Sequence, residues 1–440
     1  MSVRLLTVMG SGETAPTMVK VHRAVAERFE QRPVRGLMLD TPFGFQTNAS
    51  EIASRAQEYF RDSVGAELEI AGLRSAADLE GPRGDAIVAK LAAAPFVFAG
   101  PGSPTYALRQ WRGTLVPSVL AEKLTLGGAV TFASAAALTL GVVSVPVYEI
   151  YKVGEDPRWV DGLDLLAPLG LPAVVIPHYD NAEGGTHDTR FCYLGEERLA
   201  AMERELPSGT FVLGVDEHTA LSLDFDAGTA SVAGHGVVTV RAGGRAHTLG
   251  SGVSVPLTQL AEMAADLVAG AAGGGRRPTG AAAFAGTAEA GPGGDGQRAG
   301  AGASPLLQAV RAHEEAFRQA RDAGDAGAMV HAILELEAEM WAWRADTLQS
   351  DDMDRGRAAL RAMVAELGEI ARAGTRDPTE VVGPYVEMAL ALRDEARRAR
   401  RFADADQVRD RLVALGVEVR DSPEGSTWEL VRDGTAHGSA

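Results

Sequence analysis

The stretch GGAVTFASAAALTLG, residues 127–141, decides how the N-terminal half of this chain is interpreted. An apolar run stops at Ser134 and gives way to an alanine-rich segment that favours a helix. A sharp strand-to-helix turn exposes its apex residue and needs small neighbours, which Ala133 and residues 135–137 supply. The pattern predicts a buried strand followed by a helix. Ser134 is then either a nucleophile or only a small residue at which the strand ends.

Similar apolar runs recur between residues 2 and 250 and alternate with amphipathic segments. They are RLLTVMG, VRGLMLD, FVFAG, GAVTFAS, PAVVIPH and TFVLGVDE. This alternation predicts an α/β fold with a mainly parallel, doubly wound sheet that helices cover on both faces. The carboxyl ends of such strands collect the residues that bind ligands. Short β-rich pieces over 220–248 predict an antiparallel extension at the sheet edge.

The composition of the chain changes along its length. With 440 residues, 46% of them hydrophobic, the chain has material for two or three domains. Residues 1–268 form the expected α/β domain, and the Gly/Ala-rich residues 269–304 predict a flexible linker. Helical spacing over 305–375 predicts a bundle, and 376–430 combine helices with a strand-turn-strand ending. The C-terminal part is therefore expected to be a mainly helical domain.

Charge and cysteine content limit the expected partners and location. A formal charge of −17 disfavours non-specific binding to nucleic acid or anionic lipid. The single cysteine, Cys192, cannot form an internal disulfide, and no window approaches twenty continuous apolar residues. We therefore expect a cytoplasmic protein with no membrane partner. The sequence leaves a homo-oligomer open.

Three predicted strand ends carry the residue types of a serine hydrolase. Ser134 ends one, His178 follows another, and Asp216 with Glu217 follows the next. A serine nucleophile needs a neutral imidazole as its base and a carboxylate that orients the imidazole. The N–H of Ala135 is placed to stabilise an oxyanion, and Gly100 or Gly102 offers a second donor.

These residues occur in motifs that resemble a known family. GSGE (10–13), AGPGSPTYAL (99–108), the SAAA turn at Ser134, the His178 strand end with Arg190 downstream, and GVDEHTAL (214–221) resemble the cyanophycinase and dipeptidase E family of serine peptidases. That family has a fold like that of class I glutamine amidotransferases. The resemblance implies Ser134 as nucleophile, His178 as base and Glu217 as orienting carboxylate. We expect Gly102 and Ala135 to form the oxyanion hole, and Arg190 and Asp216 are the substrate-binding candidates.

The chain departs from the family pattern at several positions. Alanines 133 and 136 replace the two glycines of the nucleophile turn, and Pro101 replaces a glycine of the oxyanion turn. The Asp-Gln pair that helps to hold aspartyl substrates is Ile176-Pro177 here. We therefore expect a small peptide or amide substrate without assigning an aspartyl one. A catalytically inactive scaffold remains the alternative.

Two other chemistries are weaker alternatives for the same domain. VMGSGETA, with Asp40 farther along, partly matches a dinucleotide-binding fingerprint, but Asp40 lies beyond the usual spacing. HYDNAEGGTHD gathers His178, Asp180, Glu183, His187 and Asp188 at spacings that fit no helical metal motif. The sequence therefore predicts neither a cofactor nor a metal centre.

The C-terminal stretch RDEARRARRFADADQVRDRLVALGVEVRDSPEGSTWEL, residues 393–430, resembles the C-terminal module of bacterial cysteinyl-tRNA synthetases. The HIGH and KMSKS signatures of aminoacylation are missing from the chain. The resemblance therefore implies a tRNA-binding module alone, and tRNA is a candidate partner. The candidate RNA-binding residues are Arg393, Arg397, Arg400 and Arg401, although a self-neutralising surface is the alternative interpretation of this charged run.

Overall fold

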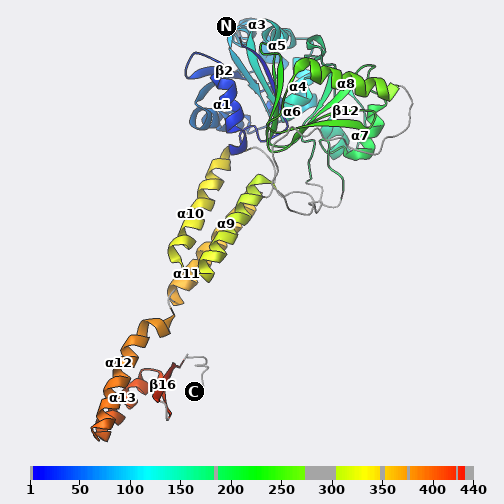
Figure 1. Ribbon diagram of the computed structural model, residues 1–440. Helices are drawn as coiled ribbons and strands as arrows, with labels where there is room; N and C mark the ends of the chain where they lie inside the picture. Colours follow the sequence, from blue (N-terminus) through cyan, green and yellow to red (C-terminus); the bar gives the residue numbers. More distant parts are fainter. Residues whose placement is uncertain are drawn as a thin grey trace. The chain divides into compact units, whose positions relative to one another are not determined.

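The computed structural model describes residues 3–182, 187–272, 304–346, 352–373, 377–422 and 425–431 (Figure 1). The chain divides into two compact units. One comprises Met1–Ser304 and Glu339–Asp351, and the other comprises Pro305–Ala338 and Asp352–Ala440. Most of the linker expected at 269–304 falls outside the described residues. None of the helices described is both long and apolar enough to span a bilayer.

Within the described residues, the first unit is built on an eight-stranded sheet of order β14-β11-β10-β1-β5-β4-β2-β3. Its strands are β1 (Arg4–Met9), β2 (Val34–Met38), β3 (Ala66–Ile70), β4 (Phe96–Ala99), β5 (Gly128–Ala133), β10 (Thr219–Asp224), β11 (Thr229–Gly234) and β14 (Ser254–Pro256). The five strands from β1 to β3 are parallel, and β10, β11 and β14 extend the sheet in antiparallel pairings. The expected α/β class with a mainly parallel sheet is confirmed.

Helices cover both faces of this sheet because successive strand residues point to opposite sides. In β4, Val97 and Ala99 pack toward α3, α4 and α5, whereas Phe96 and Phe98 pack toward α1 and α2. The helices of this unit are α1 (Val19–Glu27), α2 (Ala49–Tyr59), α3 (Gly81–Ala93), α4 (Pro104–Trp111), α5 (Val116–Leu126), α6 (Ser134–Leu138), α7 (Gly195–Glu203) and α8 (Leu257–Ala272). Every residue of β5 is buried, as expected for a strand enclosed on both faces.

A second sheet, of order β13-β12-β9-β8, carries part of the candidate site. Its strands are β8 (Ala173–Ile176), β9 (Phe211–Val215), β12 (Val237–Ala242) and β13 (Arg245–Gly250). β8 and β9 are parallel, and after β9 the chain crosses into the first sheet as β10, beside β1. The sequence predicted a single sheet with its antiparallel extension at one edge. The extension is instead shared between two sheets. The two sheets approach each other closely at Gly10, where an added Cβ would lie 1.9 Å from the Asp216 carbonyl oxygen.

The second unit is mainly helical, as expected. It contains α9 (Pro305–Asp322), most of α10 (Ala326–Ala342), α11 (Asp352–Ala373), α12 (Pro378–Arg398), α13 (Phe402–Ala414) and a hairpin of β15 (Val417–Ser422) and β16 (Gly425–Leu430). Its C-terminal module has a small core of Val386, Leu390, Leu412, Val417 and Val419.

A short segment from the C-terminal half belongs to the α/β unit. The sequence assigned residues 305–375 to one bundle, but Glu339–Asp351 group with the first unit. The reason is burial: Trp343 is 3% exposed, and Ala345 packs in the same apolar cluster as Phe43 and Tyr59. The helical periodicity of the preceding residues gives no sign of this change of neighbours.

Candidate active site

Ser134 lies at a tight turn between β5 and α6. Its φ is +50°, in the left-handed region that L-residues seldom adopt. Ala133 before it is extended, with φ −125° and ψ 152°, and Ala136 lies within α6. The unusual conformation therefore falls on the serine itself, so neither alanine that replaces a family glycine has to adopt it.

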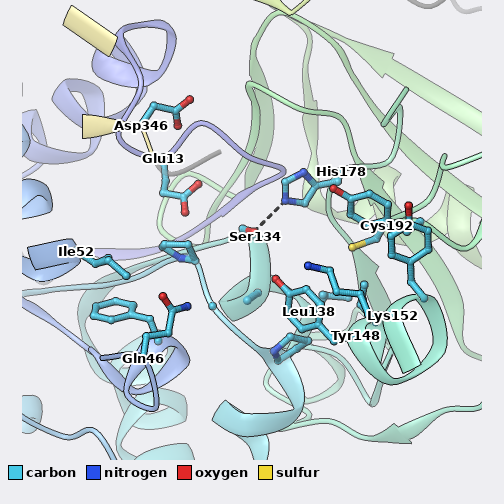
Figure 2. A pocket seen from close by; sticks show the side chains of 18 of the residues that line it. Glu13, Gln46, Ile52, Ser134, Leu138, Tyr148, Lys152, His178, Cys192 and Asp346 are labelled. Carbon is cyan, nitrogen blue, oxygen red and sulfur yellow. Dashed lines mark hydrogen bonds between the residues drawn. The ribbon is translucent and has the colours of Figure 1, made fainter. Parts of the chain in front are cut away.

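The structure brings Ser134, His178 and Glu217 together, and Figure 2 shows the contact between Ser134 and His178. The hydroxyl Oγ of Ser134 lies 2.9 Å from Nε2 of His178, and Nδ1 of His178 lies 2.8 Å from Oε1 of Glu217. The three side chains follow β5, β8 and β9 respectively. Both separations are hydrogen-bond distances, and the imidazole lies between alcohol and carboxylate. This arrangement can transfer a proton from the serine to the imidazole.

The carboxyl group of Glu217 is held in its ionised form. Burial opposes ionisation, but the hydrogen bond with His178, the His178 charge and the Asn181 amide together hold the Glu217 pKa below its usual value. Asn181 Nδ2 donates to the same Oε1 at 3.4 Å. The backbone N–H of Glu217 donates to Asp180 Oδ1 at 2.7 Å, which fixes the turn after β9. An ionised Glu217 favours the tautomer of His178 that leaves Nε2 free to accept a proton.

A cavity of about 530 Å³ opens beside the serine. Ser134 and His178 line it together with Gly102 and Ala135, the two expected oxyanion donors. The N–H of Ala136 is already engaged, because it donates to the Gly100 carbonyl at 3.2 Å. The volume suits a small ligand or the end of a peptide.

The two residues expected to bind substrate lie elsewhere. Neither Arg190 nor Asp216 is among the described residues that line this cavity. Arg190 makes paired bonds to the Asp188 carboxylate at 2.8 and 2.9 Å. Asp216 is 7% exposed, and its Oδ2 accepts the N–H of Val237 at 2.8 Å. Asp216 and Glu217 are adjacent in sequence, but only Glu217 contacts His178.

The two alternative chemistries find little geometric support. Asp40, the acidic residue of the dinucleotide alternative, is 2% exposed and accepts the N–H of Leu73 at 2.9 Å. His178 is engaged with Ser134 and Glu217, and Glu183 of the metal alternative lies outside the described residues. Across the described ranges, no group of three or more His, Cys, Asp or Glu side chains is arranged to hold a metal ion.

The arginines of the C-terminal module differ in their accessibility. Arg393 is 2% exposed, and its guanidinium makes two bonds of 2.7 Å to Asp421 and one of 3.0 Å to Ser426. It joins α12 to the hairpin and has no face toward solvent, so its placement does not support an RNA contact. Arg397, Arg400 and Arg401 are exposed, with Arg397 also paired to Asp421 and Arg401 to Asp404.

The cavity also contains residues that sequence reasoning did not assign. Glu13, Tyr148, Lys152 and Asp346 all line it. Glu13 belongs to the GSGE motif, but the motif alone gives its side chain no role. Asp346 follows a helical segment some two hundred residues beyond the nucleophile, and no local pattern marks it.

Comparison with known proteins gives matches to different parts of the chain. Residues 383–428 match the family model of the cysteinyl-tRNA ligase anticodon binding domain, which confirms the resemblance of this region. The chain is 31% identical over 132 residues to the cysteine–tRNA ligase of Maridesulfovibrio salexigens, covering 25% of this chain and 26% of that enzyme. It is 41% identical over 73 residues to the enzyme of Symbiobacterium thermophilum, covering 17% and 15%. The chain thus spans about a quarter or less of these relatives.

A solved structure is similar to the other part. The crystal structure of a peptidase from an acI-B1 Actinobacterium aligns with 58% of this chain and 97% of its own, at 20% identity and a TM-score of 0.47. The α/β fold described above rests on the strand order and helix layers of this chain itself.

The buried carboxyl group of Asp216 makes folding stability depend on pH. Burial and the nearby Asp180 raise the Asp216 pKa to about 7, above the ordinary value near 3.8. The folded state therefore binds the proton more tightly than the unfolded state, and this contribution to stability is lost as pH rises toward and through 7. We expect the free energy of unfolding of Asp216→Asn, measured in urea, to exceed that of wild type by on the order of 2–4 kcal/mol at pH 8. At pH 4 the two free energies of unfolding should be close to equal.

The matched control for this measurement is Asp161→Asn. Asp161 is exposed and paired with Arg112 at the surface. Its substitution should change the free energy of unfolding by a similar small amount at both pH values. Equal effects of Asp216→Asn at pH 4 and pH 8 would contradict the assignment of the titrating group.

Proposed function

We propose that the protein is a serine hydrolase of peptidase or amidase type, with Ser134 as nucleophile, His178 as base and Glu217 as orienting carboxylate. The observation that carries this proposal is the pair of contacts at 2.9 and 2.8 Å that join the three side chains at the edge of an open cavity. The left-handed turn at Ser134 supports it, because functional residues are where such backbone conformations are retained.

The first half of the reaction forms a tetrahedral intermediate. Oγ of Ser134 attacks the amide carbonyl carbon while Nε2 of His178 takes the hydroxyl proton. The carbonyl oxygen becomes an oxyanion, to which the N–H groups of Gly102 and Ala135 donate. One such donor contributes about 10²–10³-fold to the rate. Glu217 stabilises the imidazolium that forms.

The second half releases the product and restores the enzyme. The carbon–nitrogen bond breaks as His178 returns its proton to the leaving amine. Water then attacks the acyl carbon and gives its proton to His178, and the ester bond to Ser134 breaks. The product is a carboxylic acid, and the alcohol and neutral imidazole are regenerated.

Covalent labelling of Ser134 tests this assignment. A fluorophosphonate forms a phosphorus–oxygen bond with an activated serine and loses fluoride. We expect the full-length protein to be labelled at one site, identified by mass spectrometry of its peptides, and Ser134→Ala to lose at least about 100-fold of the labelling rate. Ser103→Ala is the control, since Ser103 caps α4 and accepts the N–H of Tyr106.

Labelling that persists in Ser134→Ala would overturn the nucleophile. Absence of labelling in wild type, with the protein folded, would favour the inactive scaffold. Loss of labelling in Ser103→Ala to the same extent would indicate a general effect on folding instead of chemistry.

We further propose that the C-terminal module binds tRNA in the cytoplasm, the location expected from the single cysteine. The match of residues 383–428 to an anticodon binding domain supports this partner. The charge of −17 over the chain repels nucleic acid, so binding has to come from a local surface. Arg400 and Arg401, exposed at the turn between α12 and α13, offer such a surface.

Filter binding of bulk tRNA at about 50 and 200 mM salt tests the RNA proposal. We expect retention that weakens with salt, and a double variant Arg400→Gln/Arg401→Gln that binds about 5–20-fold more weakly with a shallower salt dependence. Arg372→Gln is the control, because Arg372 is also exposed but lies on α11. No retention of tRNA at low salt would contradict the proposal, as would equal losses in the double variant and the control.

A further inference from the structure

The loop after β1 is fixed in several places around Glu13. Gly12 has φ +68°, and a Cβ there would lie 2.2 Å from Nδ1 of His218. Ser11 Oγ accepts the N–H of His218 at 3.1 Å. The ring nitrogen Nε2 of His22 bonds the Glu13 carbonyl at 2.8 Å. These contacts hold the backbone of Glu13 in place and leave its side chain as the part that faces the cavity.

The side chain of Glu13 is buried without a full set of partners. Glu13 is 3% exposed and lines the same cavity as Ser134 and His178. Its Oε1 has no hydrogen-bond partner among the described residues. A buried carboxyl oxygen without a hydrogen-bond partner lowers the stability of the folded protein. An unpaired buried carboxyl oxygen in a native structure calls for an explanation, and a bound ligand is one.

A second carboxyl group reaches the cavity from the segment Trp343–Asp346. The hydroxyl of Thr14, the residue after Glu13, donates a hydrogen bond of 2.6 Å to the carbonyl oxygen of Ala345. The ring of Trp343 meets the ring of His218 edge to face, with centroids 5.4 Å apart. These contacts anchor the segment to the loop after β1. Asp346, the next residue, then lines the cavity.

Two of the cationic side chains that line this cavity are already engaged. Arg55 pairs with Glu51 at 2.5 Å, and Lys152 lies 5.1 Å from the centre of the Tyr148 ring. Figure 2 shows Glu13 and Asp346 on one side of Ser134, and Lys152 and Tyr148 on the other. One side of the nucleophile is therefore acidic.

We propose that Glu13 and Asp346 form an acidic subsite that binds a cationic ammonium or guanidinium group of the substrate beside the scissile bond. This inference rests on the proposed function, since it names the substrate class of the same site. The cation can be a free α-ammonium group or the end of a basic side chain, both of which satisfy a carboxylate. Asp346, which comes after residue 303 in the sequence, is a specificity-determining residue of this subsite.

The electrostatics of Glu13 agree with a cationic ligand. Burial raises the pKa of Glu13 above its ordinary value, and a cation against Oε1 would favour the ionised carboxylate. A negatively charged substrate group beside Glu13 and Asp346 would be repelled.

A set of charged fluorophosphonates tests the subsite without knowledge of the natural substrate. The probes share one alkyl chain and end in an ammonium, a hydroxyl or a carboxylate group, with the ammonium probe made in a short and a long form. We expect the full-length protein to react at least about 10-fold faster with one ammonium probe than with the hydroxyl probe. Preference for the short form indicates an α-ammonium group, and preference for the long form indicates a basic side chain.

Variants then assign the preference to residues. Glu13→Gln and Asp346→Asn should each lower the ratio of ammonium to hydroxyl rates by about 5–10-fold. Glu67→Gln, the control, removes an exposed carboxylate that pairs with Arg35 and is not among the described residues lining this cavity, and should keep the wild-type ratio. Thermal unfolding of each variant confirms that it is folded.

The outcomes separate this inference from the proposed function. If no probe labels Ser134, the nucleophile assignment fails. If the hydroxyl probe labels Ser134 and the ammonium probes react no faster, or the carboxylate probe reacts fastest, the subsite is overturned while the nucleophile stands. A wild-type ratio in both Glu13→Gln and Asp346→Asn overturns the assignment to these two residues.

Discussion

The hydrogen bond between Ser134 and His178 depends on two residues that both hold a left-handed backbone. Ser134 has φ +50° and His178 has φ +49°. Each such conformation costs roughly 1–3 kcal/mol and persists only where the surroundings fix it. At His178 the carbonyl accepts the N–H groups of both Asn181 and Cys192. At Ser134 the buried strand β5 and the short helix α6 hold the turn from both sides.

Much of this arrangement follows from local patterns. Apolar runs that end in a polar residue predicted the parallel strands, and the alanines around Ser134 predicted the turn. The choice between Asp216 and Glu217 did not follow from the residues alone. Both stand after the same strand, and the turn that sends Glu217 to His178 and Asp216 to the Val237 amide depends on β12 and on Asp180. The family resemblance selected Glu217, and in the structure Oε1 of Glu217 lies 2.8 Å from Nδ1 of His178.

Long-range packing explains what the sequence did not reveal. The helical spacing of residues 326–342 carries no sign that Trp343 packs against His218 or that Asp346 lines the cavity. Arg393 stands in a run of arginines that looks like a basic surface, yet Asp421, far along the chain, holds it inside the module. A charge run in sequence shows neither which side chains are buried nor which acids they meet.

The proposed reaction depends most on the orientation of His178 by Glu217. The rate constant for phosphonylation of Ser134, measured in wild type and Glu217→Gln at pH 7 to 8, tests it most directly. Glutamine keeps the size of the side chain but removes the charge that selects the reactive tautomer and stabilises the imidazolium. If Glu217 orients His178, the rate constant is lower by about 10²–10⁴-fold in the variant. A rate constant within twofold of wild type would contradict it.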